Sequence, residues 1–197
     1  MINRRSAFVL AGGVMASVAT WKCSMAGSVQ MSNSSQMPVT LEINNATWQF
    51  VSDTVMGGVS RGSTVHESIA GRNALRMRGI VRLENNGGFI QVALDLRPDG
   101  SPVDASAFSG IEIDVIGNSE TYNLHLRTTD LTRPWQSYRQ SFEAGTNWET
   151  HRLPFADFEA YRTDADLDVT KLRRIGIVAI GRPFKADIAV GGIRFYK

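Results

Sequence analysis

The sequence lacks most of the residues from which active sites and metal sites are built. Cys23 is the only cysteine among 197 residues, so a disulfide within the chain is excluded. His66, His125 and His151 lie far apart and have no metal-ligand spacing. No serine occupies a nucleophile elbow, and no glycine pair has the strand–loop–helix setting of a phosphate cradle. These absences predict a protein without catalytic residues, cofactor or bound metal.

A strong charge of one sign is also missing. The formal net charge is +2, which does not suit a nucleic-acid-binding surface. Asp164, Asp166 and Asp168 are spaced like the first half of a calcium-binding loop. Val169, however, replaces the required glycine and Ile175 the required glutamate. We interpret these carboxylates as a solvated acidic loop that caps a short helix, and we predict neither a metal nor a nucleic-acid partner.

The first 26 residues have the composition of a secretory signal peptide. Arg4 and Arg5 precede an apolar stretch that ends at Val18, and residues 24–26 form a small-x-small cleavage site. The apolar stretch is shorter than the roughly 20 residues that span a bilayer, although an uncleaved N-terminal anchor is the alternative. The adjacent arginines leave both the general secretory route and the twin-arginine route open.

Residues 27–39 are polar, rich in Ser, Asn and Gln, and without periodicity, which predicts a flexible linker. The folded domain is then expected over residues 40–197. Leader and linker together predict an exported protein. It would be either periplasmic or tethered to the outer side of the inner membrane, and a cytoplasmic location is the alternative.

Beyond the linker, apolar residues alternate with polar ones, as expected for half-buried strands. Residues 175–180 are apolar on both faces, which predicts a central, covered strand. Gly57-Gly58 breaks the stretch that opens with a short strand at Trp48, and such pairs indicate positive φ or close approach by another segment. Short helical turns are expected after Pro154 and Asp168. About ten strands separated by turn signals predict an all-β jelly roll, a β-sandwich with one or two short helical turns.

Two groups of residues suggest a binding surface. His125 and Arg127 share the polar face of one predicted strand, while Trp135, Tyr138 and Trp148 lie in or beside two neighbouring strands. Exposed aromatic rings near arginines suit a protein interface or stacking on a sugar ring. The alternative for Tyr138 is the core, because alternation places it on the same side as an apolar neighbour. These five residues are the predicted set that binds a ligand or partner.

Five motifs in order resemble the complex I intermediate-associated protein 30 family: SDTVMGGVS (52–60), NGGF (86–89), FSGIEIDVIGN (108–118), YNLHLRTTD (122–130) and WETHRLPFADF (148–158). The resemblance spans nearly everything from about Leu41 to Phe195. It implies a galactose-binding-like jelly roll and a non-enzymatic role, because the mitochondrial members act as assembly chaperones for respiratory complex I. The family has no established catalytic residues to carry over. The residues that match its first two motifs are interpreted as structural: Asp53, Gly57, Gly58, Ser60, Gly87, Gly88 and Phe89.

An export signal changes what this resemblance implies for the partner. The mitochondrial members work on the matrix side, which corresponds to the bacterial cytoplasm, whereas this chain carries a leader for export. We therefore predict a non-enzymatic, exported or membrane-tethered domain that holds a protein partner, such as a respiratory-complex subunit or assembly factor. The alternative is a carbohydrate-binding β-sandwich module with a glycan ligand.

Overall fold

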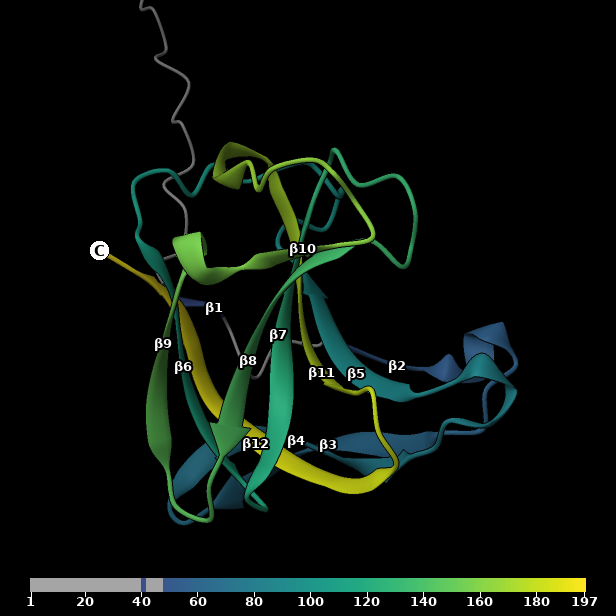
Figure 1. Ribbon diagram of the computed structural model, residues 1–197. Helices are drawn as coiled ribbons and strands as arrows, with labels where there is room; N and C mark the ends of the chain where they lie inside the picture. The colour runs from purple at the N-terminus through teal and green to yellow at the C-terminus, as the bar shows by residue number, and fades with distance from the viewer. Residues whose placement is uncertain (1–39, 42–47) are drawn as a thin grey trace, which may run out of the picture. The chain divides into compact units, whose positions relative to one another are not determined.

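The computed structural model describes residues 40–41 and 48–197 (Figure 1). By internal contacts the chain divides into two units, Met1–Gln36 and Met37–Lys197, and the description below concerns the second. The predicted leader and linker lie outside the described residues. No helix in the described part of the chain is long and apolar enough to cross a membrane.

Twelve strands in the described ranges form two six-stranded antiparallel sheets. Sheet A has the order β3-β4-β12-β6-β9, with β1 added on β12. Its strands are β1 (Thr40–Leu41), β3 (Arg61–Ile69), β4 (Arg72–Val81), β6 (Gly110–Gly117), β9 (Glu149–Pro154) and β12 (Phe184–Tyr196).

Sheet B has the order β10-β8-β7-β11-β5-β2 (Figure 1). Its strands are β2 (Gln49–Ser52), β5 (Phe89–Asp95), β7 (Glu120–Thr128), β8 (Ser137–Ala144), β10 (Glu159–Tyr161) and β11 (Leu172–Ile180). Four 3-10 turns complete the fold: η1 (Asp53–Met56), η2 (Glu84–Asn86), η3 (Phe155–Asp157) and η4 (Val169–Lys171).

The core lies between the two sheets and follows the alternation of the sequence. In β6, Ile111 and Ile113 are fully buried, and in β7, Leu124 and Leu126 are fully buried as well. Burial of each such side chain contributes about 1.5–3 kcal/mol relative to exposure. The predicted all-β sandwich is confirmed, with twelve described strands where about ten were expected. β11 lies between β7 and β5 and is covered on both faces, as predicted for residues 175–180.

Both predicted helical turns are present, and η4 has a side-chain cap. η3 follows Pro154, and η4 follows Asp168, whose carboxylate accepts a hydrogen bond from the Thr170 N–H at 3.0 Å. The same carboxylate pairs with Lys171 at 3.1 Å. η1 and η2 are two further 3-10 turns, beyond the two helical turns that the sequence pattern predicted.

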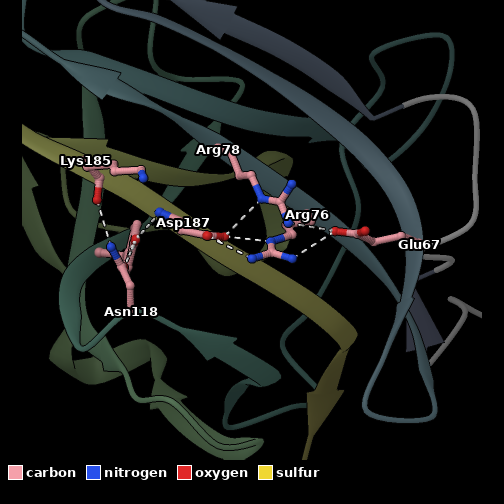
Figure 2. Close-up of polar contacts among 7 residues, drawn as sticks. Glu67, Arg76, Arg78, Asn118, Lys185 and Asp187 are labelled. Carbon is pink, nitrogen blue, oxygen red and sulfur yellow. Dashed lines mark hydrogen bonds and ion pairs between the residues drawn. The ribbon is translucent and has the colours of Figure 1, made fainter.

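The side chain of Tyr122, near the start of β7, links the two sheets by hydrogen bonds. Tyr122 points into the core, and its hydroxyl donates to Asn118 Oδ1 at 2.7 Å and accepts from the Asp187 N–H of β12 at 2.9 Å. The Asn118 side chain then donates to the Lys185 carbonyl at 2.7 Å (Figure 2). Burial raises the pKa of Tyr122 to about 12. The hydroxyl therefore remains protonated and acts as a fixed link between sheets A and B.

Candidate functional site

The two glycine-containing motifs at the start of the domain meet around one buried carboxylate. Asp53, the first residue of η1, is 0% exposed. Its Oδ1 accepts a hydrogen bond from the Ser60 N–H at 2.9 Å. Its Oδ2 accepts from the Ser60 hydroxyl (2.5 Å), the Gly88 N–H (2.6 Å) and the Phe89 N–H (3.3 Å). We call this cluster the Asp53 junction; it comprises Asp53, Gly57, Gly58, Ser60, Gly87, Gly88 and Phe89.

Each glycine pair of the Asp53 junction meets two different steric requirements. A Cβ on Gly58 would lie 2.3 Å from Asp53 Cγ, and one on Gly87 would lie 2.5 Å from Asp53 Oδ2. Gly57 and Gly88 instead have φ of 88° and 131°, which side chains rarely tolerate. One member of each pair therefore leaves room for the carboxylate, and the other allows the chain to turn.

Hydrogen bonding decides the ionisation of Asp53. Burial by itself raises the pKa of a carboxylate. The hydrogen bonds from the Ser60 hydroxyl and from the N–H groups of Gly88, Ser60 and Phe89 outweigh this and hold the pKa of Asp53 below its usual value. Asp53 is thus ionised at neutral pH, and its oxygens are fully used by the fold. Nothing in this arrangement leaves the carboxylate free for chemistry.

Arginines on the outer face of sheet A are matched by carboxylates. Arg76 donates to both oxygens of Asp187, at 2.6 and 2.8 Å, and to Glu67 at 3.1 Å, with Arg78 beside the same two acids (Figure 2). The hydrogen bond from Arg76 lowers the pKa of Asp187. A second group on this face consists of Arg152, Arg194, Glu112 and Asp114. The charges of this face are therefore largely neutralised within the fold.

The outer face of sheet B has a floor of small residues beside larger polar ones. Gly176, Val178 and Ala93 are buried, although the alternation of β11 and β5 points them away from the core. His125 of β7 lies opposite Gly176 on one side and opposite Arg139 of β8 on the other. Arg139, His125 and Gly176 therefore lie in a row across β8, β7 and β11 on the outer face of sheet B.

Three arginines approach this part of sheet B, and only one of them has an acidic partner. Arg174 pairs with Asp95 at 3.3 Å. In the described part of the chain, the ion pairs include neither Arg127 nor Arg139. The surface formed by His125, Arg127, Arg139 and Arg174 is called the arginine face below.

Arg127 is held by backbone carbonyls instead of carboxylates. Its guanidinium donates to the carbonyl oxygens of Leu131 (3.3 Å), Arg133 (2.9 Å) and Pro134 (2.6 Å). These bonds fix the loop 131–136 beside the arginine face but leave the positive charge uncompensated. The same loop carries Trp135, which is 47% exposed.

Two polar atoms of the arginine face are buried without a partner. His125 Nε2 and Arg127 Nε make no hydrogen bond with any described residue. Desolvating a polar group without a hydrogen bond costs about 1–3 kcal/mol. The buried carboxylate of the Asp53 junction thus has several hydrogen-bond donors, whereas these two atoms of the arginine face have no described partner.

Burial also shifts the ionisation of the arginine face. It lowers the pKa of His125 to about 3, and the neighbouring charge of Arg139 acts in the same direction. Burial, followed by the charges of Arg173 and Arg174, lowers the pKa of Arg127. The imidazole is therefore neutral at neutral pH, while the guanidinium groups remain charged and repel one another.

The predicted aromatic residues do not form one platform. Tyr138 is 1% exposed, and its hydroxyl donates to the Asp166 carbonyl at 2.9 Å. Trp148 precedes β9 in sheet A, and its indole N–H donates to the Ile69 carbonyl at 3.1 Å. Trp135 alone of the three lies beside the arginine face. Tyr138 is part of the core, the alternative that the alternation had left open.

The structure brings together three of the five predicted binding residues: His125, Arg127 and Trp135. It adds Arg139, Gly176 and Tyr161, which the sequence analysis did not select. The guanidinium of Arg139 lies over the Tyr161 ring, 3.4 Å from its centroid. Strand alternation places the side chains of Tyr138 and Arg139 on opposite faces of β8. The position of Arg139 beside His125, however, depends on the register of β7 with β8.

The comparisons with solved structures concern the fold. One similar structure is the family 11 carbohydrate-binding module of the cellulosomal cellulase Lic26A-Cel5E of Clostridium thermocellum. Its TM-score is 0.65 at 16% identity, over 80% of this chain and 92% of that chain. The Clostridium thermocellum module in complex with a β-1,3-1,4-mixed-linked tetrasaccharide has a TM-score of 0.63 at 17% identity, over 80% and 94%. The family 30 module of its cellulase Cel9D-Cel44B has a TM-score of 0.56 at 15% identity, over 79% and 95%.

No curated protein matches this sequence. The family model described as complex I intermediate-associated protein 30 matches residues 33–190, which include the Asp53 junction and the arginine face. The match agrees with the motifs in the sequence and with a sandwich of two antiparallel sheets. The chain belongs to the complex I intermediate-associated protein 30 family.

Proposed function

We propose that this protein is a non-enzymatic binding domain that holds a protein partner on the arginine face. The observation that carries the proposal is the pair of buried, unpartnered polar atoms on His125 and Arg127, next to the charges of Arg127 and Arg139, which have no acidic partner among the described residues. Such groups reduce stability when left alone, so a partner that supplies oxygen atoms would remove the penalty. The family description supports a protein partner connected with complex I intermediates.

The partner would lie outside the cytoplasm. The leader at residues 1–26 supports export or attachment to the outer side of the inner membrane, and the polar residues 27–39 would give the domain reach from a membrane. We infer that the partner is a respiratory-complex subunit or assembly factor exposed on that side. Fractionation followed by N-terminal sequencing tests this location, and recovery of intact chain from the cytoplasm would overturn it.

A carbohydrate-binding module is the second candidate function. It is supported by the solved structures of similar fold, one of which is a module bound to a tetrasaccharide. The aromatic rings of this chain argue against a neutral sugar, because stacking requires a free ring face. Tyr161 has Arg139 over its ring at 3.4 Å and Arg162 at 5.2 Å. Trp135 has Arg133 at 5.9 Å but stays half exposed.

Site-specific photo-crosslinking tests the protein partner. A benzoyl-phenylalanine at Trp135 would lie beside the arginine face, whereas one at Val65 would lie on the outer face of sheet A, where Val65 is 47% exposed. In cells of the source organism we expect a discrete protein adduct from position 135 and none from position 65. Equal adducts from both positions, or no adduct from either, would contradict the proposal. Titration with the mixed-linked tetrasaccharide tests the second candidate, and we expect no heat of binding.

A further inference from the structure

We propose that the arginine face recognises an acidic, extended segment of the partner protein, with a carboxylate bound by Arg139 next to His125 and attracted by the positive charge of Arg127. This inference rests on the proposed function, because it names the chemistry of the segment that the partner would present. It goes further by assigning the contact to specific side chains and to one class of ligand.

Charge complementarity is the first argument. Arg127 uses its terminal nitrogens on the carbonyls of loop 131–136 and keeps its full positive charge. Arg139 donates from Nε to Ser137 Oγ at 2.9 Å, and no carboxylate among the described residues pairs with its guanidinium. Glu159 lies opposite Arg139 in the pairing of β10 with β8, yet the two form no ion pair. An arriving carboxylate can accept paired hydrogen bonds from such a guanidinium.

The shape of the face is the second argument. A Cβ placed on Gly176 would meet nothing nearer than Gln91 Oε1 at 3.4 Å. Gly176, Ala93 and Val178 are already buried, so a segment that lies across them would contact the larger side chains around them rather than the strand backbone. An extended peptide fits a face on which no large side chain rises from the strand at Gly176, and His125 and Arg139 lie in a row beside that point.

The third argument is whether the faces of the aromatic rings are accessible, because this favours a peptide ligand over a sugar ligand. Sugar recognition would use open ring faces, but arginines lie over Tyr161, and Tyr138 is in the core. The recognition groups that remain are guanidinium donors and the nitrogen of a neutral imidazole. Such donors suit carboxylate oxygens, and the half-exposed Trp135 can pack against an apolar side chain of the same segment.

Binding of a peptide to purified protein that comprises the linker and the domain, residues 27–197, tests the proposal. The probe is a blocked octaglutamate peptide, and calorimetry at low and at physiological salt measures its affinity. We expect Arg139→Gln to weaken binding about tenfold, the effect of losing one charge-assisted hydrogen bond. Arg139→Lys, which keeps the charge, is expected to restore part of the affinity. Gly176→Val, which adds bulk to the floor, is expected to abolish binding.

The matched control is Arg78→Gln on the outer face of sheet A. Arg78 is also a strand arginine, with a side chain 50% exposed. If Arg78→Gln and Arg139→Gln weaken binding equally, the peptide responds only to net charge and the inference is wrong. Tighter binding of polygalacturonate than of the peptide would overturn it in favour of an acidic glycan. Thermal melts of each variant show whether the fold is intact, and Arg139→Lys keeps the test decisive if Arg139→Gln unfolds.

Failure of this inference can be distinguished from failure of the proposed function. An adduct from position 135 that persists in Arg139→Gln would leave the protein partner in place and reject the acidic contact. If the crosslinker at position 135 gives no adduct in the protein that retains Arg139, the partner itself is rejected. If Arg139→Gln loses both the adduct and octaglutamate binding, both statements hold.

Discussion

The Asp53 junction and the arginine face both place charged groups in the β-sandwich with little water around them, and they differ in how those groups are satisfied. Asp53 receives hydrogen bonds from one hydroxyl and three N–H groups. On the arginine face, His125 Nε2 and Arg127 Nε have no partner in the described part of the chain. A satisfied buried network stabilises and specifies a fold, whereas unsatisfied groups reduce stability and mark functional sites. The first two family motifs therefore support the fold, whereas two of the proposed binding residues, His125 and Arg127, belong to the fourth motif.

The largest effect is expected from Asp53→Asn, which tests the stabilising half of this comparison. The amide keeps one acceptor but directs an NH₂ group toward donors, so at least one buried donor loses its partner. We expect a loss of about 3 kcal/mol in the free energy of unfolding, measured by urea denaturation. Asp99→Asn is the matched control, since Asp99 caps an exposed turn through Ser101. A result for Asp53→Asn as small as that of Asp99→Asn would contradict the assigned role.

The acid dependence of stability sharpens the same point. The pKa of Asp53 is lowered in the folded state, so its contribution is fully present above the unfolded value of about 3.9 and declines as pH falls toward the folded pKa. The difference in unfolding free energy between the unmodified protein and Asp53→Asn should therefore shrink below about pH 4. Denaturation at a series of pH values measures this difference. A difference that stays constant down to pH 2 would show that the charge has no role.

The sequence predicted the fold better than the site for a physical reason. Alternation and turn residues are local, so the strands, the central position of residues 175–180 and the caps of η3 and η4 could be predicted. The glycine pairs were recognised as special, but their shared partner could not be found, because Asp53 and Gly88 are 35 residues apart in the chain. Recognition of Arg139 needed the register of β7 with β8, which depends on tertiary packing.

His125 offers a test in which the substitution is expected to keep or raise stability, in contrast to Asp53→Asn. Its pKa is lowered to about 3 by burial and by Arg139, whereas an unfolded histidine titrates near 6.5. Below about pH 6.5 the unfolded state therefore binds a proton that the folded state rejects, and stability falls as pH decreases toward 3. Nuclear magnetic resonance should show no titration of His125 between pH 5 and 8. His125→Leu should remove this part of the pH dependence and leave the stability at pH 7 unchanged or higher by about 1 kcal/mol.

The same substitution, Arg to Gln, made on each outer face separates the two faces. Arg76→Gln removes the hydrogen bonds to Asp187 and Glu67, and we expect it to cost about 1–2 kcal/mol, because these partners are only partly exposed. Arg139→Gln removes a charge that has no acidic partner, so the unfolding free energy should change by less than about 0.5 kcal/mol. Urea denaturation of the two variants side by side measures the contrast. If Arg139→Gln destabilises the domain as much as Arg76→Gln, the guanidinium supports the fold through Tyr161 and the arginine face is structural. If only Arg76→Gln destabilises, the uncompensated charge on sheet B is retained for a reason other than folding, and an external carboxylate is the partner that its geometry fits.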